Sequence, residues 1–174
     1  SSALGGTTTG EFNTAVGANA LLSNTTASYN TAVGYQTLYS STGDGYQTAV
    51  GAQALYSNTT GAFNNAFGRL ALYSNTTGSY NSAFGQDALQ NNTTASNNTA
   101  VGYQSLYTNT TGYSLTASGM ESLKFNTTGA HNSAFGKEAL RDNTTGNYNT
   151  GIGRDALPLG ISRFITLPTV TIQL

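Results

Sequence analysis

Residues 64–80 read NNAFGRLALYSNTTGSY, and similar units of 17 residues flank this stretch on both sides. The units follow one another without a single-residue slip, beginning at Asn13, Asn30, Gln47, Asn64, Asn81, Asn98, Leu115, Asn132 and Asn149. A short fixed period over most of a chain means that one small structural unit is stacked on itself. The sequence therefore predicts a solenoid or fibre rather than a globule.

Two columns of the repeat never vary. With positions numbered from 1 at Asn13 to 17 at Tyr29, position 5 is always Gly and position 9 is always Leu. A Gly at a fixed internal position indicates a backbone angle that other residues resist, or a close approach between coils. The Leu column predicts a core ladder that consists of Leu21, Leu38, Leu55, Leu72, Leu89, Leu106, Leu123, Leu140 and Leu157.

Positions 3 and 4 are both apolar and predict a strand that is buried on both faces. Position 3 is almost always Ala, which suits the inside of a narrow coil, whereas position 4 carries larger residues such as Val16 and Phe67. Successive residues of a strand face opposite sides. Two interpretations stay open: the second face packs against a neighbouring chain, or a single wide coil has a bulge beside the Gly.

The remaining columns complete the expected fold. Asn-Thr-Thr-Gly at positions 12–15 is typical of a turn, and stacked Asn side chains can form a hydrogen-bonded ladder. Positions 8–12, Ala-Leu-x-x-Asn, fit either a strand or a short helical turn. Together the columns predict an all-β protein, a β-solenoid (β-roll or β-helix) of about nine 17-residue coils followed by a C-terminal strand segment.

The repeat sets the expected organisation of the chain. Residues 1–12 are a partial repeat, residues 13–157 form the solenoid, and residues 158–174 are a segment of a different kind. Thr169–Leu174 alternates polar and β-branched apolar residues, which predicts a strand. This strand would cap the last coil or pair with a neighbouring subunit. The candidate residues for such a contact are Phe164, Ile165, Val170 and Ile172.

The repeat begins and stops at the same Ala-Leu step, at Ala3-Leu4 and Ala156-Leu157. Such matching ends predict either a fragment of a longer fibre or a subunit that polymerises head to tail, because a solenoid normally needs polar caps to avoid end-to-end association.

Composition narrows the possible partners. Charged residues make up 7% of the chain, against about 25% in an average domain, and the net charge is -1. The six Lys and Arg form no stripe able to neutralise a run of phosphates, so nucleic acid is not an expected partner. No apolar run is long enough for membrane insertion. A surface rich in Asn, Thr, Ser and Gly favours an extracellular, cell-surface or virion location.

The sequence holds no recognisable catalytic set. His131 is the single His, and it stands in a column otherwise rich in Tyr and Phe. The acidic residues are scattered over the coils, whereas calcium needs several converging oxygens. There is no phosphate-binding loop and no Ser-His-Asp arrangement. We therefore expect a protein that is not an enzyme, with no catalytic residues, no cofactor and no metal.

Three surface features leave alternatives open. Tyr39, Tyr56, Tyr73 and Tyr107 form either a sugar-stacking strip or a stack that stabilises the fibre. Thr columns give a remote chance of ice binding. Asn-Thr-Thr matches the N-glycosylation signal, although turn chemistry is the favoured explanation, at Asn24, Asn58, Asn75, Asn92, Asn109, Asn126 and Asn143.

The unit Asn-Thr/Ser-Ala-Val/Phe-Gly-x-x-Ala-Leu resembles the repeats of phage tail-fibre and surface-fibre proteins over residues 3–157. It is more distantly similar to the head repeats of trimeric autotransporter adhesins, although the period here is longer and a Leu ladder is added. The second resemblance implies a β-roll that trimerises and adheres to a surface.

We therefore expect a structural protomer of an extracellular fibre that associates with itself, as a homo-oligomer or a head-to-tail polymer. The alternative is a trimeric receptor-binding or adhesive shaft, with a cell-surface glycan as partner.

Overall fold

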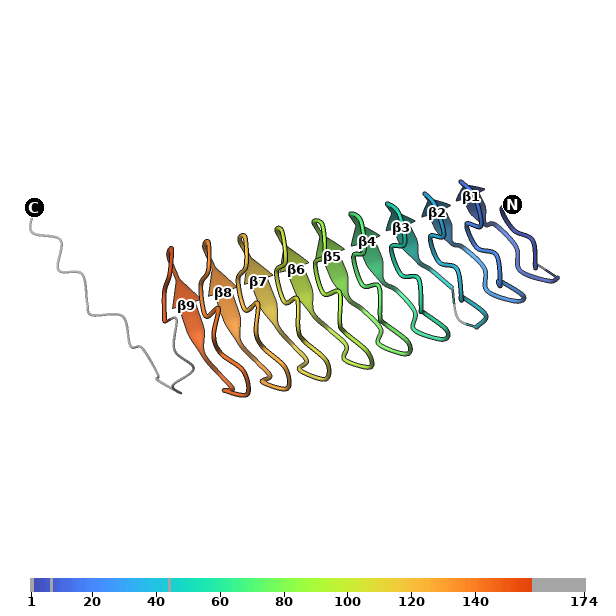
Figure 1. Ribbon diagram of the computed structural model, residues 1–174. Helices are drawn as coiled ribbons and strands as arrows, with labels where there is room; N and C mark the ends of the chain where they lie inside the picture. The colour runs from blue at the N-terminus through green and yellow to red at the C-terminus, as the bar shows by residue number, and fades with distance from the viewer. Residues whose placement is uncertain (1, 7, 44, 158–174) are drawn as a thin grey trace, which may run out of the picture.

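The computed structural model describes residues 2–6, 8–43 and 45–157, and the predicted C-terminal strand segment lies outside them. The described chain forms one parallel sheet, in which each strand pairs with the next strand along the sequence. The strands are β1 (Thr14–Val16), β2 (Thr31–Val33), β3 (Thr48–Val50), β4 (Asn65–Phe67), β5 (Ser82–Phe84), β6 (Thr99–Val101), β7 (Thr116–Ser118), β8 (Ser133–Phe135) and β9 (Thr150–Ile152). Figure 1 shows the coils stacked in chain order along a rod. The predicted all-β solenoid is confirmed.

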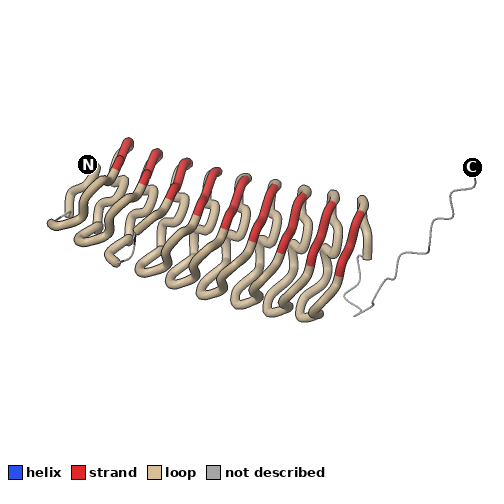
Figure 2. The backbone as a smooth tube through the Cα atoms, turned by 180° about the vertical axis from the view of Figure 1, so that it is seen from behind, coloured by secondary structure: helices blue, strands red, loops and turns tan. Residues whose placement is uncertain are grey.

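Only positions 2–4 of each repeat form a strand, and turns and loops complete each coil (Figure 2). The segment that fitted a strand or a helical turn forms a turn in each of the first eight coils. The register never slips: Ala32 of β2 pairs with Ala15 of β1 and Ala49 of β3. Each column of the sequence is therefore a physical ladder along the rod.

Left-handed backbone turns close the coil within 17 residues. The Gly at position 5 has φ between 114° and 142° in all nine coils, and a Cβ at Gly68 would lie 2.4 Å from the carbonyl oxygen of Gly85. The sequence offered a special angle or a close approach as reasons for this Gly, and both apply. Residues at positions 7, 9 and 17 are also left-handed, with φ between 49° and 62°.

The Leu of each coil adopts this left-handed conformation while buried. For a residue with a Cβ this costs about 1–2 kcal/mol, and burying a Leu side chain returns about 1.5–3 kcal/mol. The same turn directs the amide of Leu38 to the carbonyl oxygen of Ala54 in the next coil, at 3.0 Å. Burial and inter-coil bonding thus offset a strained backbone.

The core is a narrow double ladder of Leu and Ala. The structure places eight of the nine predicted core leucines, from Leu21 to Leu140, at no more than 2% exposure, and Leu157 packs partly buried against them. Alanines of positions 3 and 8 fill the space beside them, as in the fully buried pair Ala66 and Ala71. A coil this narrow has room for one large side chain, which explains the small residues opposite Leu.

A buried amide ladder runs along the turn side of the rod. From Asn75 to Asn143, each Asn of position 12 donates one Nδ2 hydrogen to Oδ1 of the preceding Asn, as from Asn75 to Asn58 at 2.7 Å. The second hydrogen goes to a carbonyl in its own turn, as from Asn75 to Gly78 at 2.9 Å. Ser41 interrupts this ladder, and Oδ1 of Asn24 has no partner in the described chain.

A second amide ladder runs through position 1. Oδ1 of Asn13 accepts the backbone N–H of Asn30 at 3.0 Å, and this pattern recurs at Asn64, Asn81, Asn98 and Asn132. Gln47 substitutes for Asn, since its Oε1 accepts from the amide of Asn64. Leu115 has no side-chain acceptor, so the ladder is broken there. The two ladders satisfy buried backbone groups that a coil without regular strands leaves unpaired.

We expect Asn92→Ala to lower the free energy of unfolding by at least about 2 kcal/mol, because it leaves buried polar groups unpaired at about 1–3 kcal/mol each. Asn92 donates to Asn75 and Ala95 and accepts from Asn109. The measurement is denaturant unfolding.

The matched control is Asn91→Ala at the adjacent, half-buried residue, whose side chain makes no hydrogen bond in the described chain. This control should stay within about 0.5 kcal/mol of wild type. Equal losses in the two variants would contradict the ladder account.

Candidate functional site

The outward face of the sheet carries an apolar column. Position 3 points inward as buried Ala, whereas position 4 points to solvent, with Phe67 at 37%, Phe84 at 41% and Ile152 at 67% exposure. We call this the outer apolar column, which Ser118 interrupts at β7 and which otherwise consists of Val16, Val33, Val50, Phe67, Phe84, Val101, Phe135 and Ile152. The expectation of a strand buried on both faces is therefore wrong for the single chain, because nothing within one coil reaches the outer face.

A column of hydroxyls accompanies the outer apolar column. Residues of position 2 lie on the same face of each strand as those of position 4, and they are Thr or Ser in every strand but β4. Phe67 and Phe84 stack with their ring centroids 5.1 Å apart. Each strand therefore presents one short polar side chain of position 2 and one side chain of position 4 on this face.

A second exposed column consists of stacked rings. Phe12, Tyr29, Tyr46, Phe63 and Tyr80 of position 17 stack with centroids 4.9–5.0 Å apart. All five rings are at least 43% exposed. We call them the aromatic ladder. The ladder ends at Tyr80, because Asn97 and Ser114 occupy the next two places in the column.

The predicted sugar strip is a different and less exposed stack. Tyr39, Tyr56 and Tyr73 are half-buried and stack at 5.0 and 5.2 Å. Gln90 separates Tyr107 from them. The edges and hydroxyls of these rings are less exposed than those of the aromatic ladder. The structure thus brings together three of the four residues, in a manner that suits stacking within the chain.

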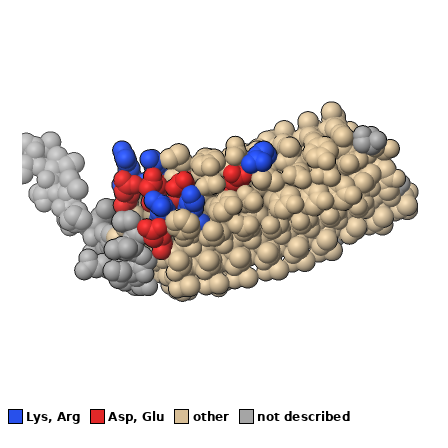
Figure 3. All heavy atoms as spheres, in the orientation of Figure 1, with Lys and Arg blue, Asp and Glu red and all other residues tan. Residues whose placement is uncertain are grey.

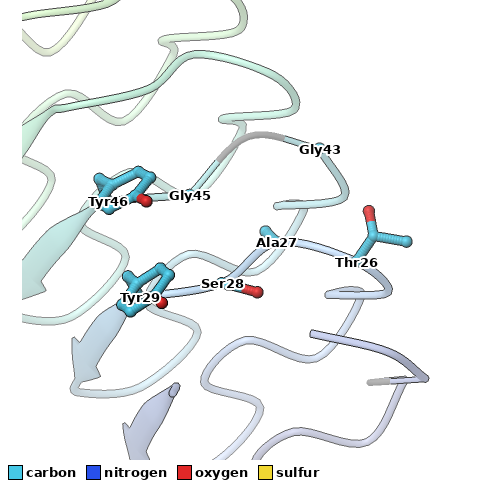
Figure 4. Close-up of a pocket in the computed structure, with 7 residues that line it drawn as sticks. All are labelled: Thr26, Ala27, Ser28, Tyr29, Gly43, Gly45 and Tyr46. Carbon is cyan, nitrogen blue, oxygen red and sulfur yellow. The ribbon is translucent and has the colours of Figure 1, made fainter. Parts of the chain in front are cut away.

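A shallow pocket of about 320 Å³ lies between the first two coils. Figure 4 shows Tyr29 and Tyr46 side by side at its wall, with the backbone of Gly43 and Gly45 above. These two glycines occupy the places that Thr60 and Ala62 have in the next coil. Gly45 permits a close approach of two backbones, because a Cβ there would collide with the carbonyl oxygen of Ser28. The size is at the lower end of the range for small-molecule sites. Its described lining offers hydroxyls, backbone groups and ring edges, and no acid or base.

Charged residues gather in the last coils, toward the C-terminal end of the rod (Figure 3). The chain has six basic and seven acidic residues, and eight of them lie between residues 121 and 155. Arg141 is the centre of this cluster: Nη1 donates to Glu138 at 3.1 Å, and Nε lies 3.8 Å from Glu121. Lys124 pairs with Glu121 at 2.9 Å. Nζ of Lys124 lies 5.5 Å from the centroid of the Phe125 ring, and Cζ of Arg141 lies 5.4 Å from it.

Two neighbouring cations, Lys137 and Arg141, lower the pKa of Glu138 below its ordinary value of 4.5. The main cause is the hydrogen bond from Lys137, followed by the one from Arg141, and slight burial opposes both. Lys137 pairs with Glu138, Arg154 pairs with Asp155, and Arg141 forms a bridge between coils to Glu121.

No three His, Asp or Glu side chains in residues 2–6, 8–43 and 45–157 could bind one ion together. His131 is exposed and stacks on Tyr148 at 5.0 Å. The predicted inter-subunit residues Phe164, Ile165, Val170 and Ile172 lie outside the described residues.

The glycosylation signals divide into buried and exposed ones. All seven Asn-Thr-Thr asparagines are fully buried, with Nδ2 donating to backbone or to the amide ladder in the examples from Asn58 to Asn143. Turn chemistry therefore accounts for their side chains. Two further Asn-x-Thr sequences, at Asn91 and Asn97, are not among the seven predicted signals, because they do not match the Asn-Thr-Thr pattern of the turn. A search for the three-residue signal alone would have found them.

Stability should fall with acid through Glu138. Because its folded pKa is lowered, its contribution is present above the ordinary value of 4.5 and is lost as pH falls through the folded pKa. We expect the thermal midpoint to drop as the pH falls below the ordinary value of 4.5, and to drop less in Glu138→Gln. An identical pH profile for the variant would show that this cluster does not couple to folding.

Comparison with known proteins leaves the function to be inferred from these surfaces. No helix in the described part of the chain is long and apolar enough to cross a membrane. No protein-family model, no curated protein and no solved structure matches the chain.

Proposed function

We propose that the protein is a structural shaft of an extracellular fibre, and that its solenoids associate side by side through the outer apolar column. The observation that carries this proposal is the column itself: it runs the length of the described sheet and places aromatic and aliphatic side chains in solvent. An exposed apolar surface of this extent is typical of an interaction site.

A second copy of the same chain is the best-matched partner. The residues of the column recur once per coil, at the spacing of hydrogen-bonded strands, about 4.8 Å. A surface whose side chains recur at the same spacing can contact the column residue by residue over all nine strands. The face carries no charged residue in β1 to β9, so two copies pack together without repulsion.

The test is the sedimentation behaviour of purified protein over a range of concentrations. Wild type should associate, and Phe84→Glu with Phe135→Glu should be monomeric, because each copy would bury two unpaired charges. The control places the same charges in the exposed turns of the same coils, as Thr94→Glu with Thr145→Glu, and should associate like wild type. A monomeric wild type, or equal dissociation of control and variant, would overturn the proposal.

An adhesive shaft is the second candidate, and the aromatic ladder favours it. Five exposed rings in a row offer edges and phenolic hydroxyls to a glycan. We expect glycan-array binding to decrease more for Tyr29→Ala with Tyr46→Ala than for the half-buried pair Tyr56→Ala with Tyr73→Ala. A larger loss of binding for Tyr56→Ala with Tyr73→Ala would indicate that the half-buried strip binds the glycan. Absence of glycan binding by wild type would reject adhesion to sugars.

A further inference from the structure

Asn97 differs from every other asparagine in an Asn-x-Thr sequence of this chain. Nine such sequences occur, and seven of their asparagines are fully buried in the Asn-Thr-Thr turns. The side chain of Asn97 is exposed and makes no hydrogen bond in the described chain. It is therefore free to react without breaking a ladder.

The signal around Asn97 is presented on a fixed backbone. The amide of Asn97 donates to the carbonyl of Ser79 at 3.1 Å, and its φ of 62° turns the side chain out of the coil. Asn98 is buried, with its own amide bonded to Asn81 at 3.0 Å. Thr99 begins β6 with its hydroxyl exposed and unpaired in the described chain. Both groups that the signal requires thus face solvent.

The other sequence of this kind lacks these properties. Asn91 is half-buried, and the hydroxyl of Thr93 donates to the carbonyl of Thr110 at 3.1 Å. A transferase that recognises this sequence would have to break the hydrogen bond from Thr93 to Thr110. Asn97 is consequently the best acceptor among the nine.

The neighbouring coil offers a place for the attached sugar. The aromatic ladder ends at Tyr80, whose ring stacks on Phe63 at 5.0 Å on one side. Asn97 occupies the next place in the same column, so no ring of the described chain covers the other face of Tyr80. A sugar linked to Asn97 would lie over this open face, and apolar sugar faces pack well on aromatic rings.

We propose that Asn97 is an N-glycosylation site, and that its first sugar stacks on Tyr80. In the reaction, Nδ2 of Asn97 forms a bond to C1 of a sugar held as a lipid-linked diphosphate. The bond between C1 and the phosphate oxygen breaks, the amide proton passes to a base of the transferase, and the lipid diphosphate leaves. Thr99 is the recognition residue of the signal.

The experiment secretes the full chain from a eukaryotic cell and measures the intact mass of the folded protein. Digestion with an amidase that converts glycosylated Asn to Asp then locates the site. We expect one glycan, at Asn97. Asn97→Gln and Thr99→Val should lose it, since Val keeps the β-branched shape of the strand residue without the hydroxyl. Asn91→Gln is the matched control and should keep it.

Folded protein without a glycan at Asn97, or with one at an Asn-Thr-Thr turn, would overturn the site. Self-association cannot mask the result if the monomeric Phe84→Glu, Phe135→Glu variant is tested in parallel, and this separates the site from the proposed fibre role. The stacking is tested by comparing thermal midpoints with and without the glycan. The glycan should raise the midpoint of wild type and not that of Tyr80→Ala, and an equal rise in both would reject the stacking.

Discussion

The constant offset of 17 residues between hydrogen-bonded partners is the constraint on which the structure depends. Every ladder, whether of leucine, amide, hydroxyl or ring, exists only because each coil has the same length. One inserted residue would shift all columns of the following coils together. The left-handed turns at positions 5, 7, 9 and 17 hold that length, and for this reason strained angles recur where ordinary proteins avoid them.

Stability and surface character have separate sources in this rod. Buried Leu and Asn ladders supply the stability, and they lie within the coil. The surface is then free to vary from coil to coil. An aromatic ladder marks the early coils and an ion-pair cluster marks the last ones. One backbone thus presents different chemistry along its length, while the outer apolar column continues through both regions.

The sequence contained most of the fold and less of the site. The period, the Leu core, the Gly at position 5 and the Asn turn could all be predicted, because the same residue type recurs at each of these positions in all or nearly all coils. The exposure of position 4 could not, since two adjacent apolar residues fit either a second wall or a solvent face. The left-handed Leu could not either, because Leu rarely adopts this conformation. The Asn97 site could not be predicted either. Asn97 lies beside Tyr80 only because successive coils stack in register, and the sequence alone does not show this neighbour.

The interrupted amide ladder at Ser41 has a mechanical consequence. Bonds between coils run along the rod, so tension on its two ends loads all junctions between coils in series. The two junctions beside Ser41 lack the amide bond of position 12 that later junctions have. Under load the position-12 ladder is therefore weakest beside Ser41, whereas it continues unbroken from Asn58 to Asn143.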